Sequence, residues 1–124
     1  MMYKTVVLVA AGGALGSVCR YLTSIITAKF WTNNFPINTL ITNVLGCFLI
    51  GLLIGLFDKN NAQNSDLKWF LITGFCGGFT TFSAFGLENV TLFQANNPLV
   101  AFGYIALSLF LGLMCVWLGL YITK

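Results

Sequence analysis

One polar segment in the third apolar stretch of the chain holds side chains whose types and spacing could bind an ion. It reads GFCGGFTTFSAFGLE over residues 74–88 and combines a glycine pair, closely spaced hydroxyl groups and two phenylalanines three residues apart. Glycine lowers helix propensity, and hydroxyl side chains compete for backbone hydrogen bonds. We therefore expect a break in the third helix within this segment, whose notable residues are Gly77, Gly78, Thr80, Thr81, Phe82, Ser83 and Phe85.

A helix break at this depth would free backbone carbonyl oxygens in the middle of a membrane. Such backbone persists only where it is buried in protein or lines an aqueous cavity, and in transporters unwound carbonyls coordinate Na⁺. If the helix resumes after the break, Phe82 and Phe85 share a face, and their positive ring edges could stabilise an anion. A phenylalanine pair on its own is more often lipid-facing or core. The combination of break, hydroxyl groups and rings is what indicates an ion path.

Further polar side chains lie in the second and fourth apolar stretches. Asn43 has Thr39 one turn earlier on the same helical face. An amide in lipid needs a partner, and an interhelical hydrogen bond is the alternative to an ion contact. Tyr104 and Ser108 share a face of the last stretch at a spacing of four. Packing between inner helices explains that weak polar stripe equally well.

Two charged residues are expected within or near the hydrocarbon. Arg20 falls in the last third of the first stretch, where it either anchors the helix by reaching the headgroups or serves the interior. Glu88 is the last residue of the polar segment and follows the expected break. We favour a structural role for Glu88, or a place in a vestibule, over proton carriage.

The rest of the chain must position these side chains inside a bilayer. Of the 124 residues, 58% are hydrophobic and only 7% are charged, whereas a soluble domain carries about 25% charged residues. Apolar stretches cover residues 5–28, 38–57, 68–94 and 98–123, and each has the ~20 residues that a spanning helix requires. Short connections predict antiparallel neighbours. We expect an all-α membrane protein with four transmembrane helices in a single transmembrane domain, residues 1–124.

Several classes of function are excluded by residue type. The chain has no histidine, and its cysteines, Cys19, Cys47, Cys76 and Cys115, lie singly in four different stretches without metal or redox spacing. We interpret them as small buried hydrophobes. The net charge of +3 is too small and scattered for nucleic-acid binding. We therefore expect neither an enzyme nor a nucleic-acid partner.

Glycines recur four residues apart, which lets helix backbones approach closely in lipid. The pairs are Gly12 and Gly16, Gly51 and Gly55, and Gly74 and Gly78. Four short spans offer little interior, so oligomerisation is also expected.

Three segments resemble the Fluc (CrcB) family of small bacterial fluoride channels. They are GGALGSVCRY in the first span, NTLITNVLGCFLIG in the second and GFCGGFTTFSAFGLE in the third, and the third is the most specific. The resemblance runs the full length of the chain. It implies a fluoride-selective passive channel in the bacterial inner (plasma) membrane, a multi-pass protein that exports fluoride from the cytoplasm and so reduces its toxicity.

The resemblance also implies an assembly and a bound ion. Two identical chains, inserted in opposite orientations, would form an antiparallel dual-topology homodimer with two pores at the interface. A central, structural Na⁺ that is not transported would be held by backbone carbonyls of Gly77 and Thr80.

Site residues carry over by position in the motifs. Phe82 and Phe85 match the rings that line the pore, and Asn43 matches the amide that donates to fluoride. Tyr104 and Ser108 match part of a polar track. The structural or pore-lining polar residues would be Arg20, Thr39, Ser83 and Glu88. The chain departs from the family at Asn38, Ala84 and Gly112, where a glycine and two hydroxyl side chains are usual.

Two other functions remain open. A dual-topology small multidrug transporter, an antiporter coupled to protons, shares the four short spans. Such transporters resemble one another in an essential acid of the first helix, and the first stretch here has none. A non-conducting assembly subunit would show no ion flux and would leave the segment from Gly77 to Phe85 without a task.

Overall fold

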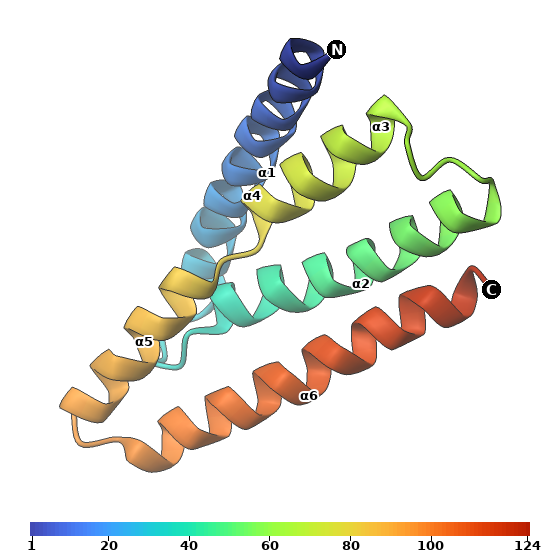
Figure 1. Ribbon diagram of the computed structural model, residues 1–124. Coiled ribbons are helices and arrows are strands. Elements are labelled where there is room, and N and C mark those ends of the chain that lie inside the picture. The colour runs from blue at the N-terminus through green and yellow to red at the C-terminus, as the bar shows by residue number, and fades with distance from the viewer.

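The chain is entirely helical in the computed structural model, which describes residues 1–124 (Figure 1). The first span is α1 (Met2–Phe30) and the second is α2 (Ile37–Lys59). The third contains α3 (Asp66–Lys68), the π-helix η1 (Trp69–Cys76), α4 (Gly77–Phe79) and α5 (Phe82–Gln94). The fourth is α6 (Pro98–Ile122). Four helices, 2–30, 37–59, 66–94 and 98–122, are long and apolar enough to cross a membrane, which confirms the prediction of an all-helical protein with four spans.

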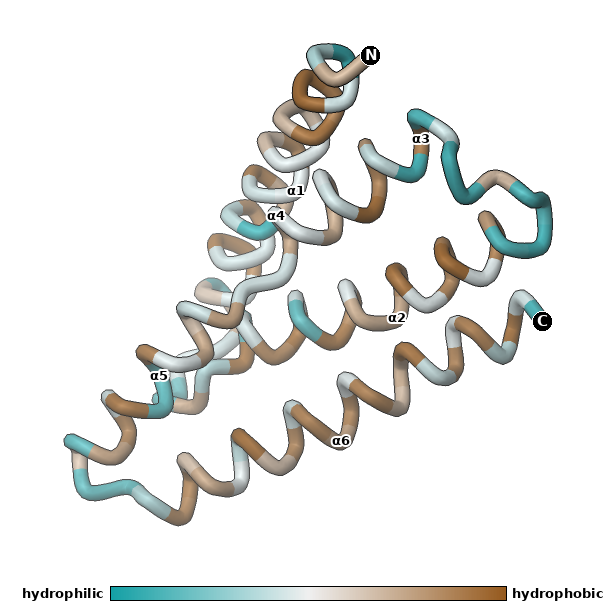
Figure 2. Tube along the Cα trace, in the orientation of Figure 1, coloured by the Kyte–Doolittle hydropathy of each residue, from teal (hydrophilic) through white to brown (hydrophobic).

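Polar residues end the spans. Figure 2 shows hydrophilic residues at the turns and hydrophobic residues along the helices between them. The hydroxyl of Ser65 accepts a hydrogen bond from the Lys68 N–H and caps the third span, and Pro98 begins α6 at a position where its missing N–H costs nothing. Both termini lie at the same end of the bundle (Figure 1). There Lys4 of α1 forms an ion pair with Asp66, with the two charged groups 2.6 Å apart.

The spans pack in two main pairs, α1 with η1 and α4, and α2 with α6. Glycines make the first pairing possible. A Cβ added to Gly74 would lie 2.8 Å from the Val9 carbonyl oxygen and 2.9 Å from the Gly12 Cα. A Cβ added to Gly78 would lie 3.1 Å from the Gly13 Cα. The glycines spaced four residues apart therefore mark a real backbone contact.

Replacing Gly74 with alanine is expected to lower the thermal unfolding midpoint of the purified protein. The new methyl group would meet the backbone of α1, and overpacking of this kind costs about 1–3 kcal/mol. Gly103→Ala is the matched control, because a Cβ there has nothing within 4 Å. An equal midpoint for the two variants would contradict the packing described here.

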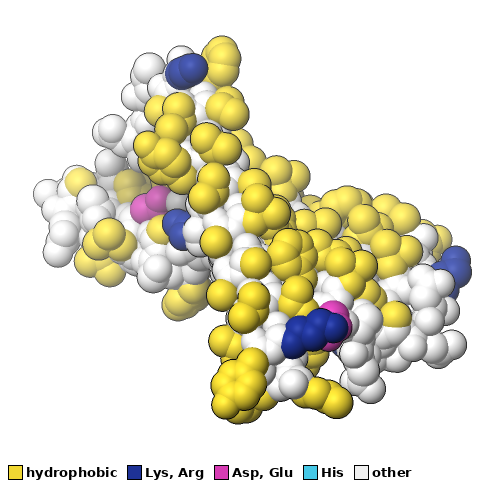
Figure 3. Space-filling model, turned by 90° about the horizontal axis from the view of Figure 1, so that it is seen from above, with side chains coloured by type: hydrophobic (Ala, Val, Ile, Leu, Met, Phe, Trp, Pro, Cys, Tyr) yellow, Lys and Arg dark blue, Asp and Glu magenta, His cyan; other side chains and the backbone are white.

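The core of a single chain is small. Only 18 of 124 residues are buried, and the main cluster consists of Leu40, Leu92, Ala101 and Tyr104. Figure 3 shows apolar side chains over most of the face in view, with few charged groups among them. Most of the large apolar side chains therefore lie outside the chain's own core.

Candidate functional site

Two residues with extended backbone separate α4 from α5. Thr80 has φ −87° and ψ 155°, and Thr81 has φ −148° and ψ 121°. The Thr81 hydroxyl accepts a hydrogen bond from the Ala84 N–H at 3.2 Å, so it caps α5. The Ser83 hydroxyl lies 3.3 Å from that of Thr81. Thus the hydroxyl-rich part of the segment forms the start of a new helix.

Asn43 of α2 holds this extended pair in place from across the bundle. Its Nδ2 donates to the Thr81 carbonyl oxygen at 3.1 Å, and its Oδ1 accepts from the Thr81 N–H at 2.8 Å. In an uninterrupted α-helix the Thr81 N–H would instead donate to the carbonyl of Gly77, four residues earlier. Because the Thr81 N–H donates to Asn43, the Gly77 carbonyl does not receive its usual helical hydrogen bond. The interhelical hydrogen bond considered from the sequence is present.

Arg20 binds the other side of the same segment. Its Nε donates to the Gly78 carbonyl oxygen at 3.1 Å. The helical donor for that carbonyl would be the Phe82 N–H, which the extended pair has moved away. A cation at the carbonyl end of a helix is also favoured by the helix dipole. Arg20 thus has a partner inside the bundle, in addition to any role as an interface anchor.

An open groove of about 560 Å³ brings together most of the residues predicted to form the ion path. Its walls come from α2, the third span and α6. Cys47 and Cys76, interpreted from the sequence only as small hydrophobes, also line it. The predicted residues in its wall are Asn43, Gly77, Thr80, Phe82, Phe85 and Ser108. Residues up to 65 positions apart in the sequence therefore meet on one surface.

The two aromatic rings of the groove meet edge to face, and the inner one meets a tyrosine of the core in the same way. The Phe82 and Phe85 centroids are 5.8 Å apart with the planes at 81°, and the Phe85 and Tyr104 centroids are 5.1 Å apart at 85°. Phe85 is partly buried, whereas Phe82 is 86% exposed. The outer ring of the pair therefore has little cover from its own chain.

A second polar cluster lies beside the groove. Glu88 accepts a hydrogen bond from the Thr39 hydroxyl at 2.6 Å and another from the Tyr104 hydroxyl at 2.9 Å. Tyr104 is completely buried (0% exposed). These three residues join α2, α5 and α6, and Glu88 also faces a separate cavity of about 370 Å³. Tyr104 and Ser108 were grouped by their spacing, but Tyr104 packs in the core while Ser108 lines the groove.

The structure shows what surrounds each of the three positions that depart from the family pattern. The Ala84 N–H donates a hydrogen bond to the Thr81 hydroxyl. Gly112 is buried against Cys47, since an added Cβ would lie 3.4 Å from the cysteine sulfur. The Oδ1 of Asn38 is buried without a hydrogen-bond partner. None of the three lines the groove.

Comparisons with known proteins point to one family over nearly the whole chain. Residues 7–120 match the family described as CrcB-like protein, Camphor Resistance (CrcB). A fluoride-specific ion channel FluC of Flavobacterium psychrophilum is 55% identical over 121 residues, which cover 98% of each chain. Proteins with the same name from Azobacteroides pseudotrichonymphae and Gloeothece citriformis are 45% and 43% identical, over 99% and 96% of this chain and 98% and 96% of their own.

These relatives are ion channels and not enzymes, and they come from bacteria. With its four spanning helices, the chain is a multi-pass bacterial membrane protein. It belongs to the CrcB family, whose members include the fluoride-specific ion channels FluC.

Proposed function

We propose that the chain forms a passive, fluoride-selective channel that lets fluoride leave the cytoplasm down its gradient. The names of its relatives support this function. The observation that carries it is the groove, where an amide, a hydroxyl group and paired aromatic rings line one surface. None of the three other main cavities joins an amide and a hydroxyl group to a phenylalanine pair that meets edge to face.

The groove offers fluoride several weak donors in place of its water. Asn43 has two amide N–H groups, and its bond to the Thr81 carbonyl uses only one of them. Ser108 has a hydroxyl donor on the same wall. The edges of Phe82 and Phe85 carry partial positive charge. Conduction requires binding that is strong enough for entry and weak enough for release, and neutral donors bind an anion more weakly than a cation would.

The conduit is completed by a second copy of the chain. The groove is open along one side, and the exposed Phe82 ring stands at its edge. We propose an antiparallel homodimer of chains inserted in opposite orientations, with two pores that are each lined by both chains. The break in the third helix lies at the centre of this arrangement, so both copies present it to the interface.

The helix break also supports a structural Na⁺ that is not transported. A small hard cation prefers oxygen ligands, and the carbonyls of Gly77 and Thr80 are suited to this role. The Gly77 carbonyl has lost its helical donor to Asn43, Thr80 has extended backbone, and both residues line the groove. Two carbonyls from each copy would supply four oxygens.

Removing Na⁺ is expected to destabilise the assembly. Purified protein dialysed into N-methylglucamine chloride should unfold at a lower temperature than protein in sodium chloride at equal ionic strength, because four facing carbonyl dipoles would lose their cation. Restoring Na⁺ should restore the midpoint. A midpoint that does not depend on Na⁺ would remove the ion from the proposal without affecting fluoride conduction.

Fluoride efflux from liposomes is the direct test of the function. Liposomes that contain the purified protein should release fluoride rapidly and downhill, as read with a fluoride electrode, and should release negligible chloride in a matched assay. Flux that appears only with an imposed proton gradient would favour the antiporter. No flux from folded protein in Na⁺-containing buffer would contradict the channel.

A further inference from the structure

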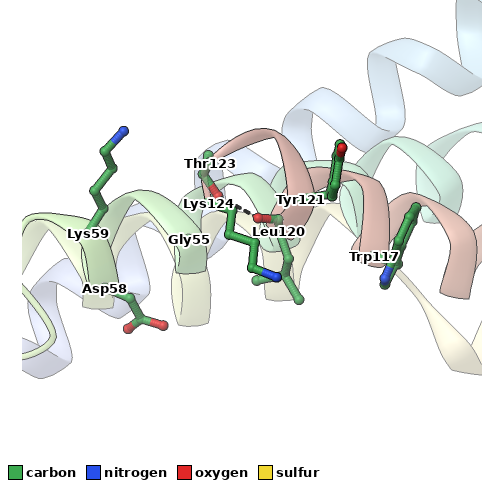
Figure 4. A pocket seen from close by; sticks show the side chains of 8 residues that line it. All are labelled: Gly55, Asp58, Lys59, Trp117, Leu120, Tyr121, Thr123 and Lys124. Atoms are coloured by element: carbon green, nitrogen blue, oxygen red, sulfur yellow. Dashed lines mark hydrogen bonds between the residues drawn. The ribbon is translucent and has the colours of Figure 1, made fainter.

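A second large cavity, of about 640 Å³, lies between the C-terminal ends of α2 and α6 (Figure 4). It shares no residue with the groove that holds the phenylalanine pair. Its lining residues are Gly55, Asp58, Lys59, Trp117, Leu120, Tyr121, Thr123 and Lys124. The fluoride conduction proposed above does not involve this cavity.

The cavity lies where two spans leave the hydrocarbon. The second span ends at Lys59 and the fourth ends at Ile122, two residues before Lys124. Trp117 and Tyr121 stack on each other, with centroids 5.4 Å apart and planes at 18°, and they are 59% and 61% exposed. Trp and Tyr are enriched at the level of lipid headgroups. The cavity is therefore at the membrane surface.

One wall of the cavity is closed and fixed. Thr123 is buried, and its hydroxyl donates to the carbonyl oxygens of Gly119 and Leu120. Gly55 leaves the space that the Thr123 side chain occupies. The Thr123 hydroxyl is thus already engaged, and a ligand would meet the charged and aromatic groups at the rim.

The charged groups at the rim have no ionic partner within the chain. The only ion pair is that of Lys4 with Asp66, and Asp58 accepts one long hydrogen bond of 3.3 Å from Gln63. Figure 4 shows the Asp58 carboxylate, the Lys124 ammonium and the Trp117 indole nitrogen pointing to the same side of the ribbon, while Lys59 points to the other. A ligand on that side meets an anion, a cation and an N–H donor.

We propose that this cavity binds the headgroup of phosphatidylethanolamine. The phosphate diester would accept hydrogen bonds from the Lys124 ammonium and the Trp117 N–H, and the lipid's primary ammonium would donate to the Asp58 carboxylate. The indole of Trp117, which stacks on Tyr121, would cover the glycerol and the start of the acyl chains. Choline has no N–H to donate to Asp58, and phosphatidylglycerol would place an uncharged glycerol beside it, so the carboxylate would have no cation.

Native mass spectrometry of the purified protein tests the proposal with three lipids of identical acyl chains. The intact chain should retain phosphatidylethanolamine about fivefold more than phosphatidylcholine or phosphatidylglycerol, as expected for one additional charge-assisted hydrogen bond at a partly exposed site. Lys124→Gln should lower retention of all three lipids. Asp58→Asn should remove the preference for ethanolamine over choline and increase retention of phosphatidylglycerol.

Lys29→Gln is the matched control, because it removes a lysine from the end of α1, outside the cavity. It should retain lipids as the intact chain does. Equal retention of the ethanolamine and choline lipids by the intact chain would overturn the proposal. So would a Lys124→Gln variant that binds phosphatidylethanolamine unchanged.

Discussion

Replacing Phe82 and Phe85 together with isoleucine is expected to lower fluoride flux in the liposome assay by at least about thirtyfold. Each ring edge contributes an interaction of about 1 kcal/mol that an aliphatic side chain cannot supply, and about 2 kcal/mol corresponds to that factor in rate. Isoleucine keeps the surface apolar, and Phe82 has little contact within its own chain. The double variant should therefore still assemble as a dimer.

A second phenylalanine pair provides the control for this experiment. Phe93 of α5 and Phe102 of α6 also meet edge to face, with centroids 5.3 Å apart and planes at 78°, but they do not line the groove. Replacing both with isoleucine should leave fluoride flux near its original value. Robust flux in the Phe82 and Phe85 variant, or equal loss in the control, would count against the aromatic-edge mechanism.

Replacing Asn43 with leucine is expected to abolish flux and to lower the free energy of unfolding by about 2 kcal/mol or more. The change leaves the N–H and the carbonyl of Thr81 without their partner, and each unsatisfied buried group costs about 1–3 kcal/mol. It also removes the spare amide donor from the groove. Thermal unfolding and fluoride efflux of the same preparation measure the two effects.

Asn89→Leu is the matched control for Asn43. Asn89 is also an asparagine inside the bundle, but its Nδ2 bonds only within α5, to the Phe85 carbonyl, and its Oδ1 has no partner. Its replacement should cost much less stability and should leave the Thr80–Thr81 backbone unchanged. Wild-type flux and stability in Asn43→Leu would contradict the role assigned to the two hydrogen bonds.

Apolar length and local composition were sufficient to predict the four spans. The details within residues 74–88 could not be read from propensity. Gly77 and Gly78, which were expected to weaken the helix, lie in α4, and Gly78 packs against Gly13 of α1. In lipid, glycine in a helix often serves close packing. The extended backbone falls instead at Thr80 and Thr81, where Asn43 supplies replacement hydrogen bonds.

The sequence also could not predict which residues far apart in the chain contact each other. Asn43 and Thr81 are 38 positions apart, and Arg20 and Gly78 are 58 apart. A single sequence identifies each polar residue as costly in lipid but does not name its partner. Tyr104 shows the same limit, because its spacing from Ser108 suggested a shared polar face, whereas its hydroxyl lies in the core against Glu88.

The pairing of spans also constrains how the protein is made. Helix α1 packs mainly on the third span and α2 mainly on α6, so each early span leaves the ribosome two spans before its chief partner. The face of α1 that carries Gly12 and Gly16 enters the bilayer uncovered and waits for η1 and α4 to be translated. The charged ends of Lys4 and Asp66 can meet only at that stage. Both main pairings are therefore complete only after the last helix has entered the bilayer.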